Sequence, residues 1–341
     1  MPGPLLEVKN LRVEFAGRRG TLTALDDISF EIAPGEILGV VGESGAGKSL
    51  TGAAIIGLLD PPGRVVGGEI RFDGRRIDNL PYEEMRRVRG RSIGAIFQDP
   101  LTSLDPLYTV GRQLVETIRT HLPLSAADAR RRAVQLLQET GIPAAEERLE
   151  QYPHQFSGGM RQRVVIALAL AGEPKLIVAD EPTTALDVSI QAQIIALLRR
   201  LCKDHGAAVM LITHDMGVIA EAADRVAVMY AGRVIEIGGV RQIIHAPCHP
   251  YSEGLMASIP SLEHRVDRLR QIDAGGGDQT HVHRAGLLGP NAGHFMVLQR
   301  SQQFDLYRQR QGAVGPAHPS RQRPWGLVRV SELRGDQPDV R

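Results

Sequence analysis

The sequence predicts an α/β fold in which helices cover a parallel β-sheet, and three observations support this prediction. Residues 37–41, 176–179 and 209–213 are short apolar runs, as expected for strands buried on both faces. Segments with helical periodicity alternate with these runs, which is typical of a parallel sheet. Residues 101–171 have a sustained helical character, so we interpret them as a helical subdomain inserted into the α/β core.

The remaining elements follow from local patterns along the chain. Residues 6–15 and 28–32 alternate apolar and polar side chains and predict half-buried strands, and residues 68–74 and 93–97 predict two further strands. A helix is predicted over residues 48–59, and the two prolines that follow are expected to end it. Ser125 and Asp128 form a capping pattern for a second helix that Gly141 ends. Further helices are predicted over residues 158–171 and around residues 190–201, where apolar side chains share one face.

Composition and charge exclude several classes of function. The 341 residues carry a net charge of +1, so no overall field attracts nucleic acid. The longest apolar stretch, residues 164–171, is far shorter than the roughly 20 residues of a spanning helix. We see no secretory signal at the start of the sequence. Cys202 and Cys248 form no CxxC pair, which argues against a disulfide framework or zinc site and favours a reducing compartment.

Residues 42–49 match the phosphate-binding pattern G-x-x-x-x-G-K-S. The glycines allow successive backbone N–H groups to turn inward around an anion, and the helix that follows directs its N-terminus to the same place. The lysine brings a positive charge to the β- and γ-phosphates, and the serine offers a hydroxyl to Mg²⁺. The candidate ATP-binding residues of this loop are Gly42, Glu43, Ser44, Gly45, Ala46, Gly47, Lys48 and Ser49.

An acidic pair follows the predicted buried strand at residues 176–179. In a parallel sheet, a carboxylate at the carboxyl end of a strand faces the ligand crevice. Asp180 therefore becomes a candidate Mg²⁺ ligand, and Glu181 a candidate general base for an attacking water. A solvated acidic turn explains such a pair equally well by itself, and the phosphate loop favours the functional interpretation.

Between these motifs, residues 156–163 read F-S-G-G-M-R-Q-R, and here the sequence resembles the ATPase subunits of ABC transporters. The resemblance implies a P-loop NTPase (RecA-like) core with an N-terminal antiparallel β subdomain and an inserted helical subdomain. It also implies that Ser157, Gly158 and Gly159 contact the γ-phosphate of an ATP held by a second subunit. Two ATP molecules would then lie between two ATPase subunits arranged head to tail.

Other positions match this family in order and spacing. Gln98 resembles the glutamine that contacts Mg²⁺ and water, which makes Ser49, Gln98 and Asp180 the expected metal ligands. Asp187 ends a segment that resembles the loop crossing the dimer interface, and His214 resembles the histidine at the γ-phosphate. Phe15 is a candidate for stacking on adenine, although an ordinary core phenylalanine is about equally consistent. Arg161 and Arg163 are expected on an exposed helical face.

Four segments, residues 97–106, 154–163, 179–187 and 249–251, are similar to the dipeptide, oligopeptide and nickel importer branch. The resemblance covers residues 5–262, so we assign residues 1–262 to the ATPase domain and expect uptake of peptides or similar small solutes. It implies a peripheral subunit on the cytoplasmic face of the inner membrane. The implied partners are two permease subunits, a second ATPase subunit of the same or a related chain and, indirectly, an extracytoplasmic solute-binding protein.

Three other functions are compatible with a phosphate-binding loop of this kind. An ABC-type ATPase of DNA repair or translation would need a long coiled coil or a second cassette, which this chain lacks. The importer-like segments argue against an exporter, and intact Glu181 and His214 argue against a module that binds ATP without hydrolysing it.

Residues 263–341 are an atypical extension, expected to be poorly structured, and we transfer no metal cluster to them. Divergence and a reading-frame change near residue 273 both account for their composition.

Overall fold

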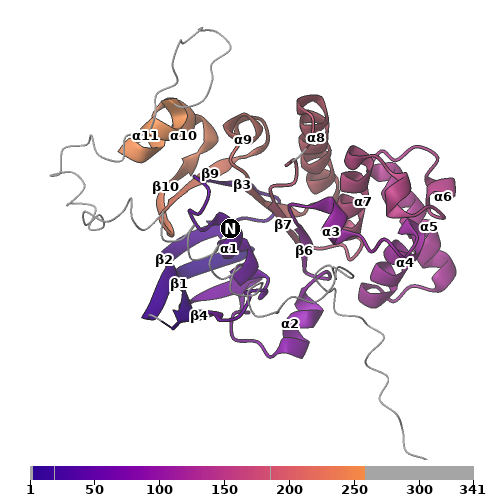
Figure 1. The fold of residues 1–341 in the computed structure, drawn as a ribbon, viewed down its shortest axis with the longest axis horizontal. Coiled ribbons are helices and arrows are strands. Elements are labelled where there is room, and N and C mark those ends of the chain that lie inside the picture. Colours follow the sequence, from indigo (N-terminus) through magenta and orange to yellow (C-terminus); the bar gives the residue numbers. More distant parts are fainter. Residues whose placement is uncertain (1–2, 19, 185, 258–341) are drawn as a thin grey trace, which may run out of the picture. The chain divides into compact units, whose positions relative to one another are not determined.

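A computed structural model describes residues 3–18, 20–184 and 186–257 (Figure 1). The chain divides into two units, residues 1–276 and 277–341, and the second unit lies outside the described residues. The predicted extension at residues 263–341 therefore stays an expectation. Within the described residues, no helix is both long enough and apolar enough to cross a bilayer.

The core of the first unit is a sheet with strand order β10-β9-β3-β8-β7-β6. Strands β9, β3, β8, β7 and β6 run parallel, and β10 pairs antiparallel with β9. Their bounds are β3 (Ile37–Val41), β6 (Ile93–Ile96), β7 (Leu176–Asp180), β8 (Ala208–Ile212), β9 (Arg225–Tyr230) and β10 (Arg233–Gly239). The sequence predicted β3, β6, β7 and β8, and these four occupy adjacent positions in the sheet.

Both faces of this sheet are buried, which explains why its strands are continuous apolar runs. Leu38 and Val40 of β3 face one hydrophobic cluster, together with α1 (Lys48–Ile55) and side chains of the antiparallel sheet. Ile37 and Val41 of the same strand face the other cluster, with α7 (Gly158–Leu170), α8 (Val188–His205) and α9 (Met216–Ala222). The predicted α/β fold is confirmed by this layering.

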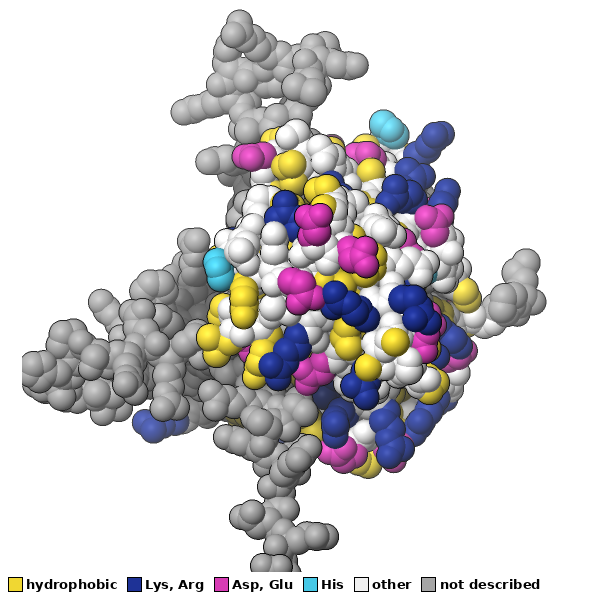
Figure 2. Space-filling view, turned by 90° about the vertical axis from the view of Figure 1, so that its right-hand side faces the viewer, with side chains coloured by type: hydrophobic (Ala, Val, Ile, Leu, Met, Phe, Trp, Pro, Cys, Tyr) yellow, Lys and Arg dark blue, Asp and Glu magenta, His cyan; other side chains and the backbone are white. Residues whose placement is uncertain are grey.

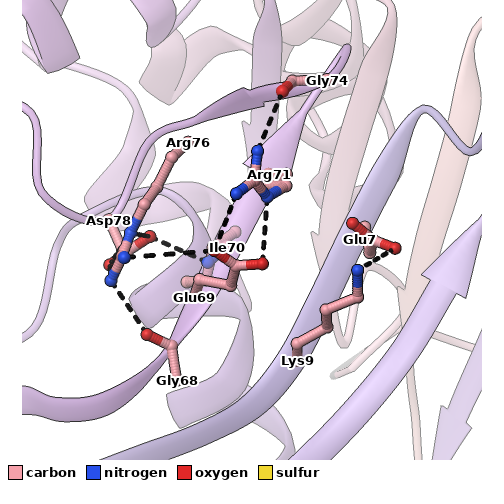
Figure 3. Close-up of polar contacts among 9 residues, drawn as sticks. All are labelled: Glu7, Lys9, Gly68, Glu69, Ile70, Arg71, Gly74, Arg76 and Asp78. Atoms are coloured by element: carbon pink, nitrogen blue, oxygen red, sulfur yellow. Dashed lines mark hydrogen bonds and ion pairs between the residues drawn. The ribbon is translucent and has the colours of Figure 1, made fainter.

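A second, antiparallel sheet covers one of these faces. Its order is β2-β1-β4-β5, with bounds β1 (Leu6–Gly17), β2 (Gly20–Ile32), β4 (Gly63–Phe72) and β5 (Arg75–Arg76). Figure 3 shows charged pairs on its strands: Arg71 donates to Glu69, and Arg76 donates to Asp78 and to the Gly68 carbonyl. Asp78 also accepts the Ile70 backbone N–H at 2.8 Å. The two arginine side chains are exposed, and ion pairs that involve exposed side chains contribute little stability individually.

The predicted helical insertion is also present. It contains α3 (Pro100–Ser103), α4 (Val110–His121), α5 (Ala126–Glu139) and α6 (Ala145–Arg148), followed by α7. Helices α4, α5 and α6 gather at the right of Figure 1. Ser125 caps α5 by accepting the Asp128 backbone N–H at 3.1 Å, as the sequence predicted. The other described helices are α2 (Tyr82–Val88), α10 (Val240–His245) and α11 (Pro250–Ala257).

The expectation that Arg161 and Arg163 lie on an exposed face was wrong. Both side chains are half-buried, because each guanidinium donates to a carbonyl at the base of the helical insertion. Arg161 donates to the Pro153 carbonyl and Arg163 to the Thr140 carbonyl, both at 2.8 Å.

Figure 2 shows the outer face on the side of α5 and α6, where acidic and basic side chains are interspersed, as expected for a chain of net charge +1.

Candidate functional site

The candidate site lies along the carboxyl ends of four adjacent parallel strands. The phosphate loop follows β3, His214 follows β8, Glu181 follows β7 and Gln98 follows β6. The spatial order of these strands is β3-β8-β7-β6, so residues far apart in the sequence meet along one edge. Ligands of open α/β sheets bind at this edge, because the loops leaving the strands converge there.

Close packing determines the shape of the phosphate loop. Gly42 has φ 149°, and a Cβ there would lie 2.1 Å from the Met229 carbonyl oxygen. Gly47 has φ 99°, and a Cβ there would lie 2.6 Å from Leu25 Cδ2. Glycine is therefore required at both positions, by backbone conformation and by space. Since α1 begins directly after Gly47, its N-terminal N–H groups are free of any side-chain cap and available to an anion.

Lys48 is 6% exposed and supplies the positive charge of the loop. Its ammonium group donates to the carbonyl oxygens of Gly42 at 2.8 Å and Glu43 at 2.9 Å. Burial lowers the pKa of Lys48, while the nearby carboxylates Glu181, Asp180 and Glu43 oppose that shift. A phosphate that replaces the two neutral carbonyls would favour the charged form, so the lysine is suited to an anionic ligand.

Ser49 and Asp180 provide the oxygen atoms of the expected metal site. The Ser49 hydroxyl donates to Asp180 Oδ1 at 2.9 Å, across 131 positions of sequence. Burial raises the pKa of Asp180, and the Glu181 charge adds to this, while Ser49 and Lys48 oppose it. A partly buried carboxylate with a raised pKa favours an added cation, and hard oxygen ligands are those that Mg²⁺ prefers. The residues present therefore fit Mg²⁺.

Glu181 is held by three side chains that approach from different elements. Its Oε2 accepts the Gln98 amide at 3.0 Å and the Thr184 hydroxyl at 2.8 Å, and its Oε1 lies 3.2 Å from His214 Nδ1. Burial works to raise its pKa, but the hydrogen bonds of Thr184 and His214 and the charges of His214 and Lys48 leave the pKa lowered. Glu181 also has φ 46°, a left-handed conformation found at constrained functional positions.

The candidate residues of the signature segment form a separate group within the chain. Ser157 caps α7 by accepting the Met160 backbone N–H at 3.4 Å. A Cβ on Gly158 would lie 3.8 Å from Leu186 Cδ2, and one on Gly159 would lie 3.0 Å from Ile190 Cγ2. The signature segment therefore adjoins the segment of Asp187, which begins α8. Among the described residues, no hydrogen bond joins residues 157–159 to residues 42–49.

Phe15 lies on β1, opposite Gly63 of β4, and is half-buried. A Cβ on Gly63 would lie 2.7 Å from Phe15 Cε1, so the ring covers this glycine. Its contact with adenine stays a prediction.

Sequence analysis missed two residues of the site. Thr184 hydrogen-bonds Glu181, and the Tyr251 hydroxyl accepts the Glu43 backbone N–H at 3.2 Å. Thr184 could have been found from its position three residues after Glu181. Residues 249–251 were noted only for their family resemblance, and the contact of Tyr251 spans 208 positions, so the local pattern could not indicate its partner.

This fold and this arrangement of loop, acidic pair and signature segment define a P-loop ATPase of the ABC type. Two family models match the chain: "ABC transporter" over residues 25–184 and "Oligopeptide/dipeptide transporter, C-terminal region" over residues 235–286. The second match extends beyond residue 262, where the resemblance in the sequence was expected to end.

Relatives and solved structures agree with these matches. The oligopeptide transport ATP-binding protein OppD of Bacillus subtilis is 53% identical over 260 residues, covering 76% of this chain and 73% of OppD. The dipeptide transport ATP-binding protein DppD of Escherichia coli is 48% identical, covering 79% of this chain and 82% of DppD. The dimeric ATP-binding cassette MJ0796, bound to ADP and Pi, is 30% identical with a TM-score of 0.62, covering 69% of this chain and 99% of that chain. The chain belongs to the ATP-binding subunits of the ABC transporter family.

Proposed function

We propose that this ATPase powers the import of peptides or similar small solutes through two membrane permease subunits, from the cytoplasmic face of the inner membrane. The observation that carries the proposal is the convergence of Lys48, the Ser49–Asp180 pair and Glu181 on one sheet edge. The match of residues 235–286 to the oligopeptide/dipeptide transporter C-terminal region supports the importer branch. An extracytoplasmic solute-binding protein would deliver the substrate to the permeases.

Each residue contributes a distinct part of the hydrolysis. Lys48 and the loop N–H groups hold the phosphates of ATP, and Ser49, Asp180 and Gln98 would hold Mg²⁺. When bound, Mg²⁺ neutralises the charge that develops on the β- and γ-phosphates. Glu181, kept ionised by its lowered pKa, accepts a proton from the attacking water as it approaches the γ-phosphate. His214 orients Glu181, and its exposed ring would contact the same phosphate.

The site of one subunit is incomplete in this proposal. Ser157 caps α7, and Gly158 and Gly159 begin it, so the three residues present a helix N-terminus suited to a phosphate. Because they form a group apart from the phosphate loop, we assign them to the γ-phosphate bound by a second ATPase subunit. The dimeric state of the MJ0796 cassette supports this assignment. Asp187, next to the signature segment, would lie at the same interface.

The importer function is tested by purifying the chain with its permease partners and reconstituting the complex in lipid vesicles. When ATP and the binding protein are supplied to the vesicles, we expect short peptides to accumulate. Glu181→Gln should abolish this accumulation. Wild-type vesicles that hydrolyse ATP but transport no peptide would leave the ATPase assignment intact and overturn the peptide assignment. Wild-type complexes without ATP hydrolysis would overturn both.

A further inference from the structure

Helix α11, the last helix of the described residues, is hydrogen-bonded directly to the phosphate loop. Tyr251, in its first turn, is 8% exposed, and its hydroxyl accepts the Glu43 backbone N–H at 3.2 Å. Its ring packs on Tyr230 with 4.5 Å between the ring centroids and 45° between the planes. This contact links the segment matched by the oligopeptide/dipeptide C-terminal model to the ATP site, and the hydrolysis described above makes no use of it.

The position of Tyr251 is fixed by a chain of hydrogen bonds that starts on β10. Glu236 accepts the backbone N–H groups of Cys248 at 2.7 Å and His249 at 3.1 Å, which determines where α11 begins. His249 Nδ1 then accepts the Tyr251 backbone N–H at 3.1 Å. The tyrosine is therefore positioned by hydrogen bonds that begin on the core sheet.

Glu43 is the residue through which Tyr251 acts on the loop. Its carbonyl oxygen accepts both the Lys48 ammonium at 2.9 Å and the Ala46 backbone N–H at 3.1 Å. The Tyr251 hydroxyl accepts the N–H of the same residue, so both backbone polar groups of Glu43, at the start of the turn that positions the lysine, are hydrogen-bonded. Burial, with the charges of Glu43 and Tyr230, raises the pKa of Tyr251 to about 12, while its hydrogen bond to Glu43 opposes that shift. The phenol thus stays neutral at physiological pH.

We propose that Tyr251 is a positioning residue that preorganises the phosphate loop for ATP and couples the C-terminal segment to nucleotide affinity. The proposal rests on the assignment of residues 42–49 to ATP. Without the hydroxyl, the half-buried Glu43 N–H loses its partner and the loop samples more conformations before it binds. Binding ATP must then order the loop, so affinity falls, while the bound and ordered loop hydrolyses ATP as before.

The test compares Tyr251→Phe with Tyr230→Phe in the full-length chain. Tyr230 is the other member of the ring pair, and its hydroxyl has no hydrogen-bond partner among the described residues. Tyr230→Phe therefore removes the same oxygen atom as Tyr251→Phe but no hydrogen bond. The dissociation constant of the non-hydrolysable ATP analogue adenylyl imidodiphosphate with Mg²⁺ is measured by calorimetry. We expect Tyr251→Phe to raise it by about two- to tenfold, the value of one hydrogen bond, and Tyr230→Phe to leave it unchanged.

A second measurement separates positioning from general loss of structure. In the complex with permeases, Tyr251→Phe should raise the KM for ATP by the same factor and leave kcat at saturating ATP unchanged. Equal affinity of Tyr251→Phe and wild type, an equal loss in Tyr230→Phe, or a fall confined to kcat would each overturn the proposal. If the wild-type chain does not bind the analogue, the ATP assignment itself fails, so the two failures are distinguishable.

Discussion

Asp180 and Glu181 are neighbours in the chain, yet the structure shifts the pKa values of their carboxyl groups in opposite directions. Burial raises the pKa of Asp180, whose Oδ1 accepts the Ser49 hydroxyl. Burial also acts to raise the pKa of Glu181, but the hydrogen bonds of Thr184 and His214 together with the charges of His214 and Lys48 leave it lowered. A bound cation would therefore stabilise the ionised form of Asp180, whereas the ionised form of Glu181 is already stabilised by its neighbours.

Asp180→Asn should stabilise the ligand-free protein at neutral pH. Because the folded state raises the pKa of Asp180, the folded chain binds this proton more tightly, and ionisation lowers the free energy of unfolding as pH rises. Asparagine keeps the Ser49 hydrogen bond and removes the charge. Thermal unfolding should show a higher Tm at pH 7, with the gain shrinking as pH falls below the pKa of Asp180. A lower Tm at pH 7 would contradict this explanation.

Glu181→Gln should have the opposite effect on stability. Its lowered pKa means that the ionised form stabilises the fold above the unfolded pKa, and this contribution is lost as pH falls through the folded pKa. Thermal unfolding of the ligand-free variant should give a lower Tm than wild type at pH 7. The two proteins should converge at acidic pH, and a constant difference at every pH would indicate a packing effect instead.

The same Glu181→Gln variant should bind ATP and hardly hydrolyse it. Only the base is removed, since glutamine can still accept from Thr184 through its amide oxygen. We expect kcat to fall by about 10²- to 10⁴-fold, with the dissociation constant for ATP within a few-fold of wild type. Phosphate-release assays and calorimetry measure the two quantities. Unchanged turnover would refute the role of Glu181.

Lys48→Ala should weaken ATP binding. The ammonium is the buried charge of the loop, and a hydrogen bond to a charged group contributes about 1.5 to 3 kcal/mol. The dissociation constant should therefore rise by about 10- to 150-fold, measured by calorimetry on the full-length chain. Lys48→Arg provides a control that keeps the charge but not the compact shape. Retention of wild-type affinity in Lys48→Ala would remove the basis for the loop assignment.

Hydrolysis should require two ATPase subunits, because Ser157 lies in a different group of residues from Lys48. The rate per subunit of the purified chain, or of the chain mixed with its related partner, should rise with protein concentration until the dimer forms. Ser157→Arg, which places a bulky cation at the α7 N-terminus, should abolish this rise and leave ATP binding intact. A rate independent of concentration in a demonstrated monomer would exclude the action of Ser157 on a second subunit.

The sequence by itself predicted the chemistry of this protein. Three local patterns carry the predicted site: residues 42–49, Asp180–Glu181 and Ser157–Gly159. Each could be interpreted because the backbone and side-chain groups that the chemistry requires lie within a few positions of one another. Buried strands were predicted as apolar runs for the same reason. The β9–β10 hairpin was not assigned, and Arg161 and Arg163 were misplaced, because their environment depends on distant carbonyls.

Only the tertiary structure decided how these parts meet. The strand order β3-β8-β7-β6 brings Gln98, His214 and Glu181 together, although 116 positions separate the first two in the chain numbering (214 minus 98). The tertiary structure also joins Tyr251 to Glu43 and places the signature segment beside Leu186 and Ile190. Both faces of the sheet are buried against helices and the second sheet, and a local apolar pattern carries no information about which distant strand becomes its neighbour.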